Sequence, residues 1–303
     1  MNVDADEVRN QSARLLSGES LRKPVDEETL DRNEVYRQAT DSHPFVHRAH
    51  YHTSIGSNAH ICDARGETIA IVMKRALPPE AARRAAEVLR PAATKTSLRA
   101  NIFGGESPQS GIAGYFDYAG SPIEHKCRKT SFTSDNIEKW PGVFPMVDYV
   151  NALYRQHAPD AWKRQNAAIP DAFRVHGSVF STLTINQRFR TAQHTDAGDF
   201  DGGFGMITVL EGDYDGLQLG FPRHGICVHM RVGDVMLFNT HQFHANTELE
   251  RESEVWSRVT CVLYYRANLG AGACMRELAR RFDEAKKAET KDEASRTAEE
   301  KEA

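Results

Sequence analysis

The sequence of 303 residues predicts an α+β fold in which helices flank a compact antiparallel barrel or jelly roll. Two observations support this prediction. From Phe173 to residue 268 the chain consists of short apolar or alternating segments, separated by turn sequences such as EGDYDG and RVGD. Before them, residues 135–168 place apolar side chains at helical spacing around Pro141 and Pro145.

The individual elements follow from local signals along the chain. HICDARGETIAIVMKRAL predicts two short strands around an Arg-Gly turn, and PPEAARRAAEVLRP predicts a helix that begins at a proline and ends at Pro91. The glycine-rich stretch NIFGGESPQSGIAGYFDYAGSP is predicted to form a long loop. The barrel strands are predicted in FRVHGSVFSTLTIN, RTAQHT, FGMITVLE, GLQLGF, GICVHMRVGDVMLFN and SRVTCVLYYR.

The domain organisation is expected to have three parts. Residues 1–40 lack sustained apolar periodicity and are predicted to form a mobile arm. Residues 41–270 are predicted to form one folded domain, with the barrel mainly in 173–268. Residues 271–303 are predicted to form a helix that loses its apolar face after Phe282 and ends in an acidic tail.

Charge and cysteine usage limit the class of protein. Of the 42 acids and 38 bases, 17 acids and 11 bases lie in residues 1–35 and 281–303, which leaves 25 acids and 27 bases elsewhere. This near-neutral middle permits a local basic groove for nucleic acid, although the formal net charge is -4. The five cysteines are scattered and never form Cys-x-x-Cys, which favours reduced thiols over a disulfide scaffold or a zinc ribbon.

Neither a membrane span nor a secretory signal is visible in the sequence. No apolar run has the length that a span needs, and the first thirty residues are acidic and polar. We therefore expect an intracellular protein, nuclear if eukaryotic and cytoplasmic if viral or bacterial, with no membrane partner. The sequence indicates no protein partner.

His194 and Asp196 lie two positions apart in RTAQHTDAGDF, at the predicted end of a strand. Because alternate side chains of a strand share a face, the imidazole and the carboxylate can converge on one point. A third ligand is expected from GDVMLFNTHQFHANTELE, whose apolar strand ends in His241 and His244. These histidines are three positions apart and cannot share a strand face, so we choose His244 and keep His241 as the alternative. Two imidazoles and one carboxylate leave three positions of an octahedral ion open, which favours Fe(II) over zinc.

The strand SRVTCVLYYR predicts the site of a co-substrate. With a period of two, its first arginine shares a face with four further side chains, and this face consists of Arg258, Thr260, Val262, Tyr264 and Arg266. A 2-oxo acid that chelates such an iron needs a cation at its far carboxylate, and arginine offers a planar fork of donors. We therefore predict that Arg258 and Thr260 bind the co-substrate.

These segments resemble the TET/JBP dioxygenases, which oxidise the 5-methyl group of pyrimidines in DNA using iron(II) and 2-oxoglutarate. The resemblance covers residues 100–270, includes CRKTSFT upstream of the barrel, and is closest to the JBP side and to viral and algal relatives. It implies a double-stranded β-helix core, cupin-like, with flanking helices, so that the folded domain is a dioxygenase domain. It also implies that His194, Asp196 and His244 are the iron ligands and that Arg258 is the 2-oxoglutarate arginine.

The resemblance further implies contacts with DNA. Asp199 falls where family members place a residue that hydrogen-bonds the flipped base, which makes it a candidate catalytic residue, although a carboxylate that caps the AGDFDGG turn is an equal alternative. Arg266 falls where animal TET enzymes carry a base-contacting histidine. From charge alone, candidate DNA contacts are Arg188, Arg190, Lys126, Arg128 and Lys129, although such residues usually form solvated faces, and Arg188 and Arg190 are also candidates for the co-substrate. Candidate aromatic side chains for stacking on the base are Phe180, Phe200, Phe204 and Tyr264.

Together these residues predict an enzyme that flips 5-methylcytosine out of DNA and oxidises it to 5-hydroxymethylcytosine with Fe(II) and 2-oxoglutarate. Thymine is the alternative substrate, and ascorbate is the alternative co-substrate because an algal relative uses it as a carbon donor. Two further candidates are a small-molecule or protein hydroxylase on the same barrel and a barrel that binds modified DNA without catalysis. The histidines at 43, 47, 50, 52 and 60 lack a fixed ligand spacing, so a surface or structural role is favoured over a second metal site.

Overall fold

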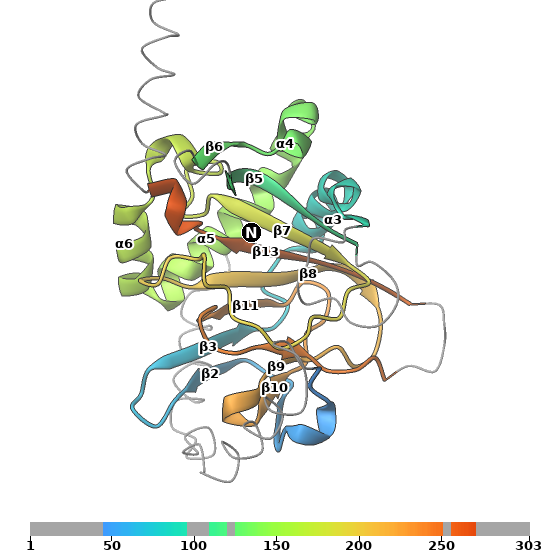
Figure 1. The fold of residues 1–303 in the computed structure, drawn as a ribbon. Coiled ribbons are helices and arrows are strands. Elements are labelled where there is room, and N and C mark those ends of the chain that lie inside the picture. Colours follow the sequence, from blue (N-terminus) through green and yellow to red (C-terminus); the bar gives the residue numbers. More distant parts are fainter. Residues whose placement is uncertain (1–44, 96–108, 120–124, 251–255, 271–303) are drawn as a thin grey trace, which may run out of the picture.

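Two β-sheets packed face to face form the centre of the structure (Figure 1). The structure is a computed structural model and describes residues 45–95, 109–119, 125–250 and 256–270. The arm and the acidic tail expected at the two ends of the chain lie outside the described residues.

The larger sheet has nine strands, and every pairing in it is antiparallel. Its order is β2 (Ala59–Cys62), β3 (Thr68–Met73), β11 (Val235–Phe238), β8 (Gly205–Asp213), β13 (Ser257–Tyr264), β7 (Thr182–Gln187), β5 (Gln109–Ala119) and β4 (Thr94–Lys95), with β6 (His125–Lys129) paired to β5. The smaller sheet has four strands, in the order β1 (Thr53–Ile55), β10 (Ile226–Val228), β9 (Leu219–Phe221) and β12 (Ala245–Asn246). In the smaller sheet, β1 pairs parallel to β10 and the other pairs are antiparallel.

Strand alternation divides the larger sheet between two apolar cores. On β8, Ile207 and Val209 face the smaller sheet and contact the core that includes Phe221, whereas Met206 and Leu210 face the helices. Burial on both faces therefore explains why apolar side chains follow one another along the first half of this strand. The two packed sheets with flanking helices confirm the predicted α+β jelly-roll class.

The helices cover the face of the large sheet that lies away from β9 and β10 (Figure 1). They are α3 (Pro79–Leu89), α4 (Ser131–Asp135), α5 (Phe144–His157) and α6 (Pro159–Ala168). Short 3-10 helices span Arg48–His50, Arg90–Ala92, Trp140–Val143, Asp171–Phe173, Pro222–His224 and Ala267–Gly270. Proline opens α3, as predicted, and alanines and leucine at helical spacing bury one face of it against the sheet. Within the described residues, no helix combines the length and the apolar character that crossing a membrane requires.

The predicted glycine-rich loop is wrong over its second half, where residues 109–119 form the long strand β5. Two of its glycines meet close packing or unusual backbone geometry. A Cβ on Gly111 would lie 1.8 Å from the carbonyl oxygen of Ala92, and Gly114 has φ +85°. The glycine content that suggests a loop is therefore a requirement of a strand with a neighbouring chain against it.

Two further expectations need correction. RTAQHT does not form a regular strand, and an isolated bridge between His194 and His244 replaces it. Cys127 is disulfide-bonded, whereas Cys62, Cys227 and Cys261 are free, so the expectation that every cysteine is a reduced thiol is wrong for Cys127.

A buried carboxylate fixes the turn that leads into β11. Asp234 has no exposed surface, and it forms an ion pair with Lys74. Its two oxygens also accept the backbone N–H groups of Arg75 and Arg231 at 2.8 and 2.7 Å. The RVGD sequence therefore has a structural role, because its aspartate connects the end of β3 with the start of β11.

We expect Asp234→Ala to lower the free energy of unfolding by about 3 kcal/mol, because it leaves a cation and two N–H groups without their acceptor. Chemical denaturation measures this change. The matched control is Asp160→Ala, which removes an exposed ion pair with Lys163 and should cost less than about 1 kcal/mol. Equal losses in the two variants would contradict the role given to Asp234.

Candidate active site

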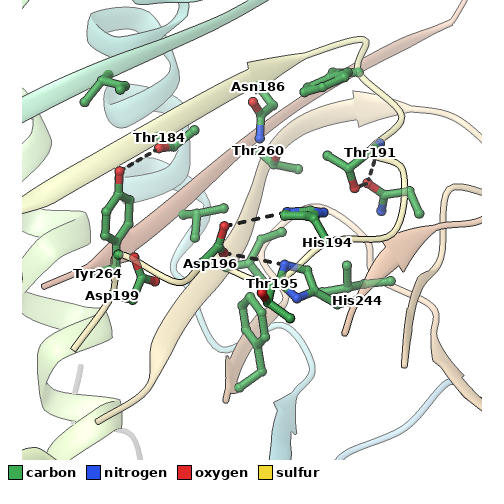
Figure 2. Close-up of a pocket in the computed structure, with 18 of the residues that line it drawn as sticks. Thr184, Asn186, Thr191, His194, Thr195, Asp196, Asp199, His244, Thr260 and Tyr264 are labelled. Carbon is green, nitrogen blue, oxygen red and sulfur yellow. Dashed lines mark hydrogen bonds and ion pairs between the residues drawn. The ribbon is translucent and has the colours of Figure 1, made fainter. Parts of the chain in front are cut away.

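A cavity of about 290 Å³ lies between the two sheets and is lined by the predicted metal ligands, co-substrate residues and base-contacting residues. Its walls come from β5, β7, β8, β11 and β13 of the large sheet, from β9 and β12 of the small sheet, and from the segment after β7. Figure 2 shows the side chains from β7, from β13 and from the segment after β7 around this cavity. A cavity with this mixture of apolar walls and a few convergent polar groups is typical of a ligand site.

His194, Asp196 and His244 meet in this cavity, and their potential ligand atoms all lie within 4.8 Å of one another. Nε2 of His194 is 3.6 Å from Oδ1 of Asp196, and Nε2 of His244 is 3.5 Å from Oδ2 of the same carboxylate (Figure 2). The backbone produces this meeting, because His194 and His244 exchange two N–H to carbonyl hydrogen bonds of 3.0 Å each. The amide of Asp196 also donates to the carbonyl of Thr240 at 2.9 Å.

The second nitrogen of each histidine is held by a backbone carbonyl. Nδ1 of His194 lies 2.7 Å from the carbonyl oxygen of Ala192, and Nδ1 of His244 lies 2.8 Å from that of Gln242. A carbonyl only accepts, so each Nδ1 carries the proton and each Nε2 keeps its lone pair for the cavity. This arrangement is the usual outer support of a metal-binding imidazole.

The donor set suits a divalent transition metal. Two neutral imidazoles and one carboxylate on one side of an ion leave the other side open for further ligands, which is the pattern of non-haem iron oxygenases. His241, the alternative third ligand, does not line the cavity. Its Nε2 instead lies 3.8 Å from Oδ1 of Asp201.

Arg258 and Thr260 line the cavity from β13, together with the three further side chains that strand alternation predicted. Arg258 is only 3% exposed, and its buried Nε has no hydrogen-bond partner. A buried guanidinium with an open donor is costly unless a ligand completes it. An organic carboxylate is the ligand that this fork of donors matches.

Asp199 lines the same cavity and is 7% exposed. Burial raises the pKa of Asp199 well above its ordinary value, and the neighbouring charge of Asp196 raises this pKa further. Its buried Oδ2 has no hydrogen-bond partner. Asp199 thus brings a buried carboxyl group to the wall of the cavity, beside the hydroxyl of Thr240.

Arg266 lies at the cavity with its orientation fixed by an acid that the sequence analysis missed. Its Nε donates to Oδ1 of Asp117 at 2.6 Å, and Nδ2 of Asn268 donates to Oδ2 of Asp117 at 2.6 Å. A Cβ on Gly198 would lie 1.6 Å from Nη1 of Arg266, so the guanidinium lies directly against this glycine. The ion pair with Asp117 raises the pKa of Arg266 despite its partial burial.

The other predicted DNA contacts do not line this cavity. The guanidinium of Arg190 donates to the carbonyls of Val46 and Asn246 and lies over the ring of Phe45, so the structure assigns it to internal contacts. Arg188 is exposed and lies over Trp256, with 5.0 Å between Cζ and the ring centroid. Arg128 and Lys129 line a separate cavity of about 480 Å³. The side chain of Lys126 lies outside the described part of the structure.

Of the four aromatic side chains predicted to stack on the base, one lines the cavity. Phe180 is fully buried beside Tyr154, and Phe204 packs against the same helical core, so the prediction is wrong for both. Phe200 packs against Tyr265 rather than in the cavity. Tyr264 does line the cavity, with its hydroxyl 3.1 Å from Oγ1 of Thr184 (Figure 2).

Several further residues line the cavity that were not predicted from the sequence. They are Phe116 from β5, Asn186 from β7, Thr191 and Asn246. A signal for Asn186 is present in the strand TLTINQ, because polar side chains recur there at every second position within an apolar segment. Outside the cavity, His47 lies 3.7 Å from Glu248 and His60 contacts Thr68, while His43 lies outside the described residues.

Comparisons with known proteins point to an oxygenase family, which agrees with the donor set of this site. Residues 111–267, slightly more than half of the chain, match the Tet_JBP family, described as the oxygenase domain of the 2OGFeDO superfamily. Thymine dioxygenase JBP1-B of Trypanosoma cruzi (strain CL Brener) is 54% identical over 254 residues, which cover 83% of this chain and 31% of that protein. Thymine dioxygenase JBP1 of Leishmania infantum is 53% identical over 268 residues, which cover 87% of this chain and 33% of that protein. The chain thus spans about a third of the length of these relatives.

Among solved structures, NgTET1 in complex with 5mC DNA is similar with a TM-score of 0.54 and 13% identity, over 78% of this chain and 88% of that one. This likeness concerns the fold alone and agrees with the double-stranded β-helix architecture. Fold, residue pattern and family match lead to one conclusion. The chain belongs to the Tet_JBP family of oxygenase domains, whose superfamily is defined by iron(II) and 2-oxoglutarate.

Proposed function

We propose that this chain is a thymine dioxygenase domain that hydroxylates the 5-methyl group of thymine in DNA. The observation that carries the proposal is a His-Asp-His cluster facing a buried arginine across one cavity, in a chain about half identical to proteins named thymine dioxygenases. The relatives favour thymine, the alternative substrate, over the 5-methylcytosine that the sequence alone predicts. DNA as substrate would also place the domain in the compartment that holds DNA.

The three side chains His194, Asp196 and His244 would hold Fe(II). When bound, the iron and 2-oxoglutarate would activate dioxygen, which supplies the oxygen atom and the oxidising equivalents that convert a methyl C–H bond into C–OH while 2-oxoglutarate is converted to succinate and CO2. The backbone carbonyls at each Nδ1 orient the two rings so that each Nε2 faces the cavity. Arg258 and Thr260 would bind the far carboxylate of 2-oxoglutarate, and the unpaired Nε of Arg258 supports this assignment.

Asp199 and Arg266 would contact the base, which must leave the duplex to reach this cavity. The pairing edge of thymine offers one donor, N3–H, between two carbonyl acceptors, whereas that of 5-methylcytosine offers an amino group, a ring-nitrogen acceptor and one carbonyl. The free acceptor of Asp199 matches N3–H, and the donors of Arg266 match the carbonyls. An acceptor at Asp199 also fits the amino group of 5-methylcytosine, so the relatives named thymine dioxygenases, rather than this contact, favour thymine.

Mass spectrometry of nucleosides tests the substrate. One duplex contains thymine and unmodified cytosine, and the other contains 5-methylcytosine with uracil in place of thymine. Incubation with Fe(II) and 2-oxoglutarate should yield 5-hydroxymethyluracil from the first duplex, and parallel reactions with ascorbate alone should yield none. Product from the second duplex only would overturn the thymine assignment. Tight DNA binding without product from either duplex would overturn catalysis and favour a binding module.

Substitution of two histidines in the same segment tests which of them binds the metal. We expect His244→Ala to reduce product formation by at least about 100-fold and to abolish the weak visible band of anaerobic Fe(II) with 2-oxoglutarate, because the ion loses a ligand. His241→Ala is the matched control and should keep both within about threefold. The reverse pattern would assign the third ligand to His241.

Asp117 is expected to act on DNA through Arg266. Asp117→Asn keeps the size of the side chain but removes the charge that holds Nε of Arg266. We expect the KM for duplex DNA to rise about tenfold, because a charge-assisted hydrogen bond is lost, while the KM for 2-oxoglutarate stays unchanged. Asp135→Asn, an exposed carboxylate beside the separate cavity, serves as the control. An equal rise of both KM values would contradict a specific role in holding Arg266.

A further inference from the structure

We propose that Tyr214 is a positioning residue that holds the guanidinium of Arg258 ready for the far carboxylate of 2-oxoglutarate. This inference rests on the proposed function, since it deepens the role given to Arg258. Tyr214 does not line the cavity, so it would act on the co-substrate only through the arginine.

The ring of Tyr214 is a neighbour of the buried guanidinium. The Cζ atom of Arg258 lies 5.3 Å from the ring centroid, within the range of a cation–π contact. Both residues are nearly buried, with 4% of Tyr214 and 3% of Arg258 exposed, so the contact is shielded from water. No acidic side chain of the described residues forms an ion pair with Arg258.

The choice of a ring rather than a carboxylate has a chemical consequence. A carboxylate partner would occupy the N–H donors of the arginine and would compete with an incoming organic acid. An aromatic face stabilises the positive charge through its quadrupole and leaves the donors in the plane of the guanidinium open. The unpaired Nε of Arg258 is what this arrangement predicts.

Tyr214 is held through its hydroxyl, its backbone and its ring, whose centroid also lies 5.1 Å from Cζ of Arg231. Its hydroxyl donates to the carbonyl of Met230 at 2.6 Å. The backbone carbonyl of Tyr214 accepts from Nη1 of Arg231 at 2.7 Å, and Nη2 of the same arginine is 2.8 Å from Oδ1 of Asp215. The ring is therefore fixed independently of any ligand, as a positioning residue must be.

A glycine opposite Arg258 makes room for the ring. In the register of β8 and β13, Arg258 pairs with Gly212. A Cβ at position 212 would lie 2.8 Å from Cδ1 and Cε1 of Tyr214, closer than such atoms approach. The sequence EGDYDG, which by itself indicates only a turn, thus contains the space and the ring that the arginine needs.

Anaerobic titration of the Fe(II)-loaded chain tests the inference, with the visible band as the readout of binding. We expect Tyr214→Leu to weaken 2-oxoglutarate about tenfold, and Tyr214→Phe to bind it within about twofold of the unchanged chain, because the ring remains. The second ligand is 2-oxobutyrate, which lacks the far carboxylate, and its affinity should be the same in all three proteins. In steady-state assays, Tyr214→Leu should raise the KM for 2-oxoglutarate while leaving kcat and the KM for DNA nearly unchanged.

The outcomes separate this inference from the proposed function. If the unchanged chain binds no 2-oxoglutarate, the proposed co-substrate is wrong and this inference is lost with it. If the unchanged chain binds it and Tyr214→Leu binds equally well, or loses 2-oxobutyrate equally, only the role of Tyr214 is overturned. Gly212→Ala is the second variant should Tyr214→Leu not fold, since its Cβ displaces the ring and should give the same selective loss.

Discussion

The pair of backbone hydrogen bonds between His194 and His244 is the constraint on which the site depends. It joins two segments 50 residues apart in the chain and belongs to no regular strand. Because the bonds run between main-chain atoms, the closeness of the two imidazoles does not rely on the side chains themselves. Asp196 is tied to the same pair through the carbonyl of Thr240, so the three donor groups are arranged before any ion arrives. Such preorganisation spares the metal the entropic cost of gathering its ligands.

Two unpaired polar atoms buried at the cavity between the sheets lower the stability of the fold. Arg258 and Asp199 each keep a buried polar atom without a partner, whereas the buried carboxylates of Asp117 and Asp234 are fully engaged. Unpaired buried groups cost free energy, and they persist where a ligand completes them. The contrast between Asp234 and Asp199 therefore separates a carboxylate that supports the fold from one that is available to a substrate.

Strand alternation predicted the cavity-lining face of β13, and the spacing of His194 and Asp196 pointed to a shared site, because both depend only on local geometry. The segment RTAQHT suggests a regular strand because two ligands stand at alternate positions, yet a single bridge is enough to orient them. The strand β5 is hard to recognise because Gly111 and Gly114 look like loop residues until the backbone at Ala92 and at Ser181 is seen against them. Asp117 and Tyr214 carry no sequence signal of their own, since their importance arises from the arginines that they meet in the folded chain.

The two arginines of the cavity illustrate how a partner sets what a guanidinium can bind. Arg266 is paired with the carboxylate of Asp117, so the pair is neutral overall and suits a neutral pyrimidine that needs directional donors. Arg258 is next to the ring of Tyr214 and keeps its full charge, which suits a dicarboxylate co-substrate. If Arg266 were paired with a ring, it would keep a full charge beside the neutral base. If Arg258 were paired with an acid, its charge would be neutralised where the organic acid is expected to bind. The acid on β5 and the ring just after β8 would thus suit the two halves of the cavity to different ligands.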